Sequence, residues 1–177
     1  MEIEKENSSF VKLAMHYGMI LGLFWLFKYL FIIGDGFTSH FFIYFFYLLN
    51  VGTFLLIYII YIKYKNLDME KPKGLLQSAL FMAAVCFFAS FFEGLIMFVH
   101  YKIIHPESFR DMIRPFINMV NNLPVPQNAD VAQFEKAKEI YVGIFSNRVV
   151  YIIFNFIGNT ILGFTLALLI GIISKSD

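Results

Sequence analysis

Four long apolar stretches constrain this chain more than any other feature of its sequence. They occupy residues 11–33, 41–62, 75–99 and 149–173, and few polar residues interrupt them. A helix of about 20 residues rises roughly 30 Å, which is the thickness of the hydrocarbon layer of a bilayer. Since that layer offers no hydrogen bonds to the backbone, we predict an all-α fold, an integral membrane four-helix bundle.

Composition agrees with this prediction and excludes several classes of protein. Hydrophobic residues make up 59% of the chain and charged residues 15%, whereas soluble domains are about half apolar and a quarter charged. The stretches take up about half the length, so we expect residues 1–177 to form a single membrane domain without a separate soluble catalytic domain. A net charge of +1 argues against a nucleic-acid partner, and the single Cys86 excludes an intramolecular disulfide.

The short loops between the first three stretches predict the orientation in the membrane. The loop at residues 34–40 contains no lysine or arginine, whereas the loop at residues 63–74 contains Lys63, Lys65, Lys71 and Lys73. Basic residues in short loops favour the cytoplasmic side. We therefore expect a multi-pass protein of the cell inner membrane with both termini in the cytoplasm, and the loop at 100–148 outside.

The outer loop at residues 100–148 contains the pattern of an amphipathic helix. Its apolar residues recur at helical spacing: Phe109, Met112, Ile113, Phe116, Ile117 and Val120. We expect this helix to start after Pro106, to kink or break near Arg114 because Pro115 removes a backbone hydrogen bond, and to cover an apolar surface.

A second helix should follow in the same loop. Asp130 with Gln133 three residues later resembles a capping box. The apolar side of this helix is marked by Val131, Phe134, Tyr141 and Phe145. The pattern leaves open whether the chain bends at Ser146–Asn147 or runs straight into the last stretch.

Two ionisable side chains inside the stretches are candidates for function. Lys28 and Glu93 lie ~8 and ~9 Å below the outer ends of their helices, at one depth. Asn50, Asn155 and Asn159 also fall in the outer half. The functional interpretation is a polar cavity or an exchangeable proton; the structural one is a direct Lys28–Glu93 pair supported by amides, or a lysine that reaches outward.

Small residues recur at four-residue spacing on three of the stretches. They are Gly18 and Gly22, then Cys86, Ser90 and Gly94, then Gly163, Ala167 and Gly171. Small residues allow helix backbones to approach closely in lipid. We interpret them as packing positions inside one chain, with a homodimer interface as the alternative.

The sequence contains no motif of an enzyme nucleophile, a phosphate-binding loop or a zinc protease. His40, His100 and His105 could supply metal ligands, but their spacing matches no tight metal motif. We therefore predict no catalytic residue, no metal and no cofactor.

Three segments carry a resemblance to a known family: Tyr17–Leu23 after a charged N-terminus, Lys73–Ala79 at the end of the basic loop, and Tyr101–Phe109. With the helical insertion that follows, they make nearly the full chain similar to the domain of unknown function 4199 family, small bacterial membrane proteins typical of Bacteroidota. His105 stands where that family usually has an acidic residue before the proline. The resemblance implies a membrane fold and no mechanism; a glycosyltransferase, a frequent gene neighbour in the family, becomes a candidate partner.

From these observations we expect a non-enzymatic accessory or scaffold protein embedded in the lipid bilayer. Its outer loop would contact a membrane protein partner, the membrane surface or a second copy. The alternative is a small transporter or ion-conducting protein that uses the Lys28, Glu93 and asparagine cluster. Continuous stretches without an internal repeat favour the scaffold.

Overall fold

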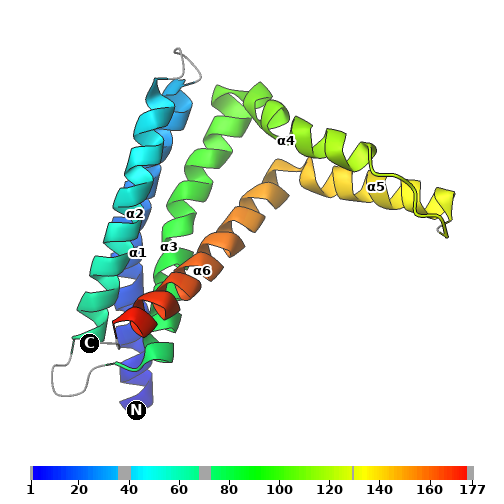
Figure 1. The fold of residues 1–177 in the computed structure, drawn as a ribbon. Coiled ribbons are helices and arrows are strands. Elements are labelled where there is room, and N and C mark those ends of the chain that lie inside the picture. Colours follow the sequence, from blue (N-terminus) through cyan, green and yellow to red (C-terminus); the bar gives the residue numbers. More distant parts are fainter. Residues whose placement is uncertain (1, 36–40, 68–72, 129, 175–177) are drawn as a thin grey trace. The chain divides into compact units, whose positions relative to one another are not determined.

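The computed structural model describes residues 2–35, 41–67, 73–128 and 130–174, and every regular element in these ranges is helical (Figure 1). The long helices are α1 (Glu2–Asp35), α2 (Phe42–Lys65), α3 (Leu75–Val99) and α6 (Arg148–Ile173). Four segments are long and apolar enough to cross a membrane: Ser9–Asp35, Phe42–Lys65, Leu75–Ile104 and Arg148–Ile173. The prediction of an all-helical fold with four candidate membrane spans is therefore confirmed.

Contacts divide the chain into two compact units, which we call the bundle unit and the hairpin unit. The bundle unit comprises residues 1–96 and 155–177, and the hairpin unit comprises residues 97–154. The hairpin unit thus contains the loop predicted at residues 100–148 together with a few residues from the ends of α3 and α6. Each unit is described by itself below.

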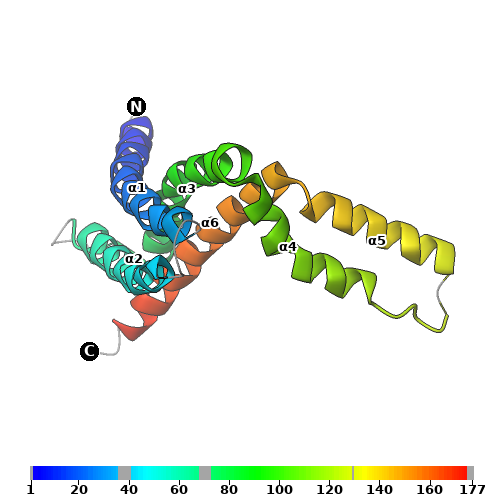
Figure 2. The same ribbon diagram turned by 90° about the horizontal axis from the view of Figure 1, so that it is seen from above.

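In the bundle unit, α3 packs against the three other helices. The ring of Phe81 on α3 stacks on Tyr64 of α2 with the ring centroids 3.7 Å apart, and α3 also contacts α1 and α6 through glycines. Both views show α1 alongside α2 (Figure 2). Many apolar side chains point outward instead, among them Tyr44 and Leu48 on α2. An apolar exterior is unfavourable in water and suits a helix surrounded by lipid.

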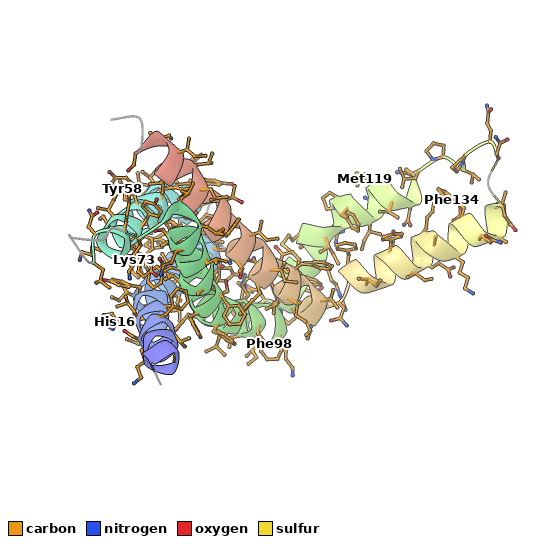
Figure 3. The ribbon with its side chains drawn as sticks, turned by 90° about the horizontal axis from the view of Figure 1, so that it is seen from below. His16, Tyr58, Lys73, Phe98, Met119 and Phe134 are labelled. Atoms are coloured by element: carbon orange, nitrogen blue, oxygen red, sulfur yellow. The ribbon has the colours of Figure 1, made fainter. Side chains whose placement is uncertain are left out.

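The hairpin unit contains a π-helical turn, η1 (His100–Ile104), and the helices α4 (Pro106–Asn121) and α5 (Val131–Phe145). α4 and α5 run side by side, as the positions of Met119 and Phe134 illustrate in Figure 3. Of the apolar stripe predicted on α4, Phe109, Ile113 and Val120 are buried, whereas Met112 is exposed. The helix continues through Pro115 without the break that we considered.

Side chains set the limits of α5 and α6. The carboxylate of Asp130 accepts hydrogen bonds from the backbone N–H groups of Ala132 and Gln133 at 2.8 and 3.4 Å, so Asp130 is the N-cap of α5. Asn147 Oδ1 accepts from the backbone of Val149 at 2.9 Å at the start of α6. The bend that the sequence left open therefore lies at Ser146–Asn147, between two separate helices.

The buried side of α5 differs from the predicted apolar side. Phe145 contacts Phe116 of α4 at 4.9 Å between ring centroids, and Phe134 is half-buried. Val131 and Tyr141, which we placed on the same side, are exposed. Lys138 is buried in their place, and its ammonium donates to the Asn121 carbonyl at 3.3 Å and lies above the Phe134 ring. The lysine stem covers apolar surface while the ammonium bonds the last residue of α4.

Candidate functional site

The polar residues predicted inside the membrane form two contacts between helices, both in the bundle unit. In the first, Lys28 Nζ on α1 donates a hydrogen bond to Asn50 Oδ1 on α2 at 2.9 Å. The amide nitrogen of Asn50 donates in turn to the Phe46 carbonyl at 3.2 Å, which holds the amide oxygen toward the lysine. Lys28 is only 6% exposed, so this contact satisfies a charge that has been removed from solvent.

Aromatic rings complete the surroundings of the Lys28 ammonium. Its nitrogen lies 5.1 Å from the centroid of the Phe46 ring and 5.9 Å from that of the Trp25 ring. Both distances are within the range of cation–π attraction, which strengthens when the cation is desolvated. The ammonium is thus held by one amide oxygen and two ring faces.

The second contact joins α3 to α6. Asn159 Nδ2 donates to Glu93 Oε2 at 2.7 Å, a length typical of a hydrogen bond to a charged acceptor. The same amide nitrogen lies 3.0 Å from Asn155 Oδ1, one turn earlier on α6. The three side chains form a short chain in which each amide orients the next group.

Lys28 and Glu93 both lie in the bundle unit, the lysine on α1 and the glutamate on α3. Within the described ranges, however, no ion pair of 4 Å or less joins them, so the Lys28–Glu93 pair of the structural interpretation is not made by direct contact. Each charge instead has an amide partner on the helix that packs beside its own. Equal depth along two helices places two residues at one level, but the rotation of each helix decides which neighbour a side chain meets.

Predicted packing residues lie at close approaches between helices. A Cβ added to Gly18, Gly22 or Gly163 would lie 2.9 Å from a carbonyl oxygen of α3, and one added to Gly171 would overlap the hydroxyl of Tyr61 on α2. Ser90 is buried and donates to the Cys86 carbonyl at 2.8 Å, Ala167 is fully buried, and Gly94 is half-buried. Only a residue without a side chain allows these backbones to approach so closely.

The histidines do not form a metal centre in the part of the chain that the structure describes. The rings of His100 and His105 lie 5.8 Å apart, and His40 falls outside the described residues. Groups of three His, Cys, Asp or Glu side chains that could hold a metal are absent from the described ranges.

Chemically, the two polar contacts are suited to holding helices together. A cavity of about 420 Å³ in the bundle unit is lined by residues of α1 and α3, including His16 and Phe92, and by none of the five polar residues. Glu93 and Lys28 are bonded to amides of adjacent helices and do not line this space. Interhelical hydrogen bonds of this kind contribute roughly 0.6 to 2 kcal/mol each in membrane proteins.

Comparison with known proteins identifies the family. The family described as protein of unknown function (DUF4199) matches residues 16–176, which is almost the whole chain. The chain belongs to the DUF4199 family. No curated protein and no solved structure matches it. The match runs from the first part of α1 to the end of α6, so it includes both units of this DUF4199 protein.

Some charged residues of the hairpin unit of this DUF4199 protein could not be recognised as a group from the sequence. Lys138 was not singled out, although it follows Phe134 by four residues and precedes Phe145 by seven, which is the spacing of one helix face. Lys102 and Arg148 were also overlooked. They line a groove described below, and their proximity depends on tertiary structure rather than on spacing along the chain.

Proposed function

We propose that this DUF4199 protein is a non-enzymatic accessory or scaffold protein of the inner membrane, with both termini in the cytoplasm. The observation that carries the proposal is an exposed apolar face on α5, outside the candidate spans. Ile140, Tyr141 and Ile144 are 53%, 59% and 42% exposed and lie within one and a half turns on one side of the helix.

An exposed apolar face on a helix that already packs well is a frequent sign of an interaction surface. α5 contacts α4 through the half-buried Phe145 and the buried Lys138, so the face formed by Ile140, Tyr141 and Ile144 is not needed for that packing. We propose that it contacts another membrane protein. A glycosyltransferase is one candidate, from gene neighbourhood in the family, and a second copy of the chain is another.

Photo-crosslinking in native membranes tests this proposal. A benzophenone amino acid at Tyr141 should give a discrete protein adduct, while the same group at Glu139, an exposed residue on the polar side of α5, should give none. An adduct of twice 20.6 kDa would identify a second copy, and peptide sequencing would identify any other partner. Equal yields at the two positions, or no protein adduct from Tyr141, would contradict the proposal.

The proposed orientation rests on the lysines at residues 63–74 and has its own test. Asn66 follows α2, and Asn128 lies in the turn before α5; both are exposed. A membrane-impermeant maleimide added to intact cells should label Asn128→Cys and leave Asn66→Cys unlabelled. The native Cys86 is buried and provides the background. Labelling of Asn66→Cys alone would invert the orientation.

A transporter is the second candidate, favoured by the buried Lys28 and the half-buried, oppositely charged Glu93 in one bundle. Their amide contacts support a structural role instead. In proteoliposomes, Glu93→Gln should leave ion leakage unchanged if the scaffold proposal is correct. Ion flux that depends on Glu93 would favour the transporter.

A further inference from the structure

We propose that a basic groove in the hairpin unit binds the phosphate of an anionic phospholipid of the surrounding membrane. The groove has a volume of about 760 Å³ and lies within residues 98–149. It is a different surface from the exposed face of α5, so this inference is independent of the scaffold proposal.

Four cationic side chains line the groove: Lys102, Arg110, Arg114 and Arg148. Two of them, Arg110 and Arg114, pair with Glu107 at 3.2 Å and Asp111 at 2.7 Å. These arginine side chains are each 68% exposed, and exposed pairs of this kind are weak and readily exchanged for another anion. With both acids counted, the groove still has an excess of two positive charges (4 − 2).

The other two cations have no carboxylate partner in the described parts of the chain. Lys102 Nζ lies 5.1 Å from the centroid of the Phe98 ring. The guanidinium of Arg148 donates to the Pro106 carbonyl at 3.3 Å and lies 5.8 Å from the centroid of the Phe109 ring. A guanidinium donates five hydrogens, so Arg148 keeps donors for a phosphate after bonding one carbonyl.

Apolar side chains complete the lining, and this favours a lipid over a free anion. The groove includes Phe98, Phe109, Ile113, Ile117 and Val149. Of these, Phe98 and Val149 remain exposed at its edge, where an acyl chain could lie against them. A small inorganic anion would leave these apolar side chains uncovered. A phospholipid can bind the cationic side chains with its phosphate and the apolar side chains with its acyl chains.

The position along the candidate spans places the groove at headgroup level. Lys102 lies near the end of the segment Leu75–Ile104, and Arg148 is the first residue of the segment Arg148–Ile173. The ends of membrane spans lie where the hydrocarbon meets the headgroups. Lysine and arginine side chains at this level are within reach of the lipid phosphates, which they bind through charge-assisted hydrogen bonds.

Binding to the full-length protein tests the inference. Delipidated protein in a neutral detergent is titrated with phosphatidylglycerol, with phosphatidylcholine and with inorganic phosphate, and the shift in thermal unfolding is followed. We expect phosphatidylglycerol to stabilise the protein at concentrations at least about tenfold below those of the other two. Equal effects of the two lipids, or stabilisation by inorganic phosphate at the concentration where the lipid acts, would overturn the proposal.

Charge variants locate the site. Lys102→Gln with Arg114→Gln keeps Arg148 and its structural bond, and should weaken phosphatidylglycerol binding about tenfold or more. The matched control, Lys63→Gln with Lys136→Gln, removes the same charge outside the groove and should change binding less than about twofold. Equal losses in both variants would show general attraction of the lipid to a basic protein and would refute the groove. The proposal would also be refuted if the groove variant bound phosphatidylglycerol as tightly as the unmodified protein.

Discussion

Replacement of Gly163 by alanine should destabilise the protein through a single added methyl group. Gly163 lies on α6 where that helix meets α3, and a Cβ there would overlap Cys86 Sγ and would be 2.9 Å from the Met82 carbonyl oxygen. Real Cβ atoms essentially never come closer than 3.0 Å to another heavy atom. The sulfur could rotate, but the carbonyl belongs to the backbone of α3, so the two helices must separate.

The expected magnitude follows from comparison with a second glycine on the same helix. Overpacking of this kind costs ~1–3 kcal/mol. Alanine also favours the helix by ~1 kcal/mol relative to glycine, which partly masks the cost. Gly158 is exposed, and a Cβ there meets nothing within 4 Å. The difference between Gly163→Ala and Gly158→Ala cancels the helix term and should be about 1–3 kcal/mol.

Denaturant unfolding in detergent, followed by the fluorescence of the single Trp25, measures both variants. Gly158→Ala should be neutral or slightly stabilising. Adding Cys86→Ala to Gly163→Ala removes the sulfur contact but leaves the contacts with the Cβ of residue 86 and with the Met82 carbonyl oxygen, both at 2.9 Å, so stability should recover only in part. If Gly163→Ala unfolded at the same denaturant concentration as Gly158→Ala, that result would contradict the close packing of α6 against α3 at Gly163.

Three further predictions concern polar contacts. Asn50→Leu leaves the Lys28 ammonium buried without its acceptor and should cost about 3 kcal/mol or more. Adding Lys28→Met should restore part of that stability, and no recovery would argue against the contact. Asp130→Ala should cost about 1 kcal/mol and speed hydrogen exchange in the first turn of α5; unchanged exchange would exclude the cap. Lys138→Met removes the bond to the Asn121 carbonyl. It should therefore quicken protease cleavage at residues 122–128, and equal cleavage rates would show that this bond does not hold the hairpin.

Much of the architecture could be predicted because lipid simplifies the relation between sequence and structure. A backbone without water must be helical, so apolar length alone predicted four long helices, although α1 begins at Glu2, well before the predicted residue 11. The N-cap of α5 could also be predicted, because Asp130 directly precedes an apolar helical pattern and its carboxylate can accept hydrogen bonds from the first backbone N–H groups of a helix. In the structure Asp130 makes these hydrogen bonds. The π-helical turn at His100–Ile104 has no comparable local signal, and the sequence analysis did not anticipate it.

The partners of the polar residues could be predicted less well. Depth along a helix follows from counting residues, and it placed Lys28 and Glu93 at one level. Which side chain lies opposite depends on the rotation and crossing of the helices, and these are set by packing across the whole interface. Asn50 and Asn159 therefore took the places that we had assigned to the opposite charges.

The contact between Lys28 and Asn50 also bears on the order in which the chain enters the bilayer during synthesis. A lysine inside a lone helix opposes insertion, by ~2.5–3.5 kcal/mol at the helix centre and by less nearer an end, where Lys28 lies. Asn50 follows Lys28 by 22 residues, so its amide is absent until α2 has been made. α1 and α2 therefore gain most by leaving the insertion machinery together as one helical pair, and we expect the first helix to wait beside that machinery for the second.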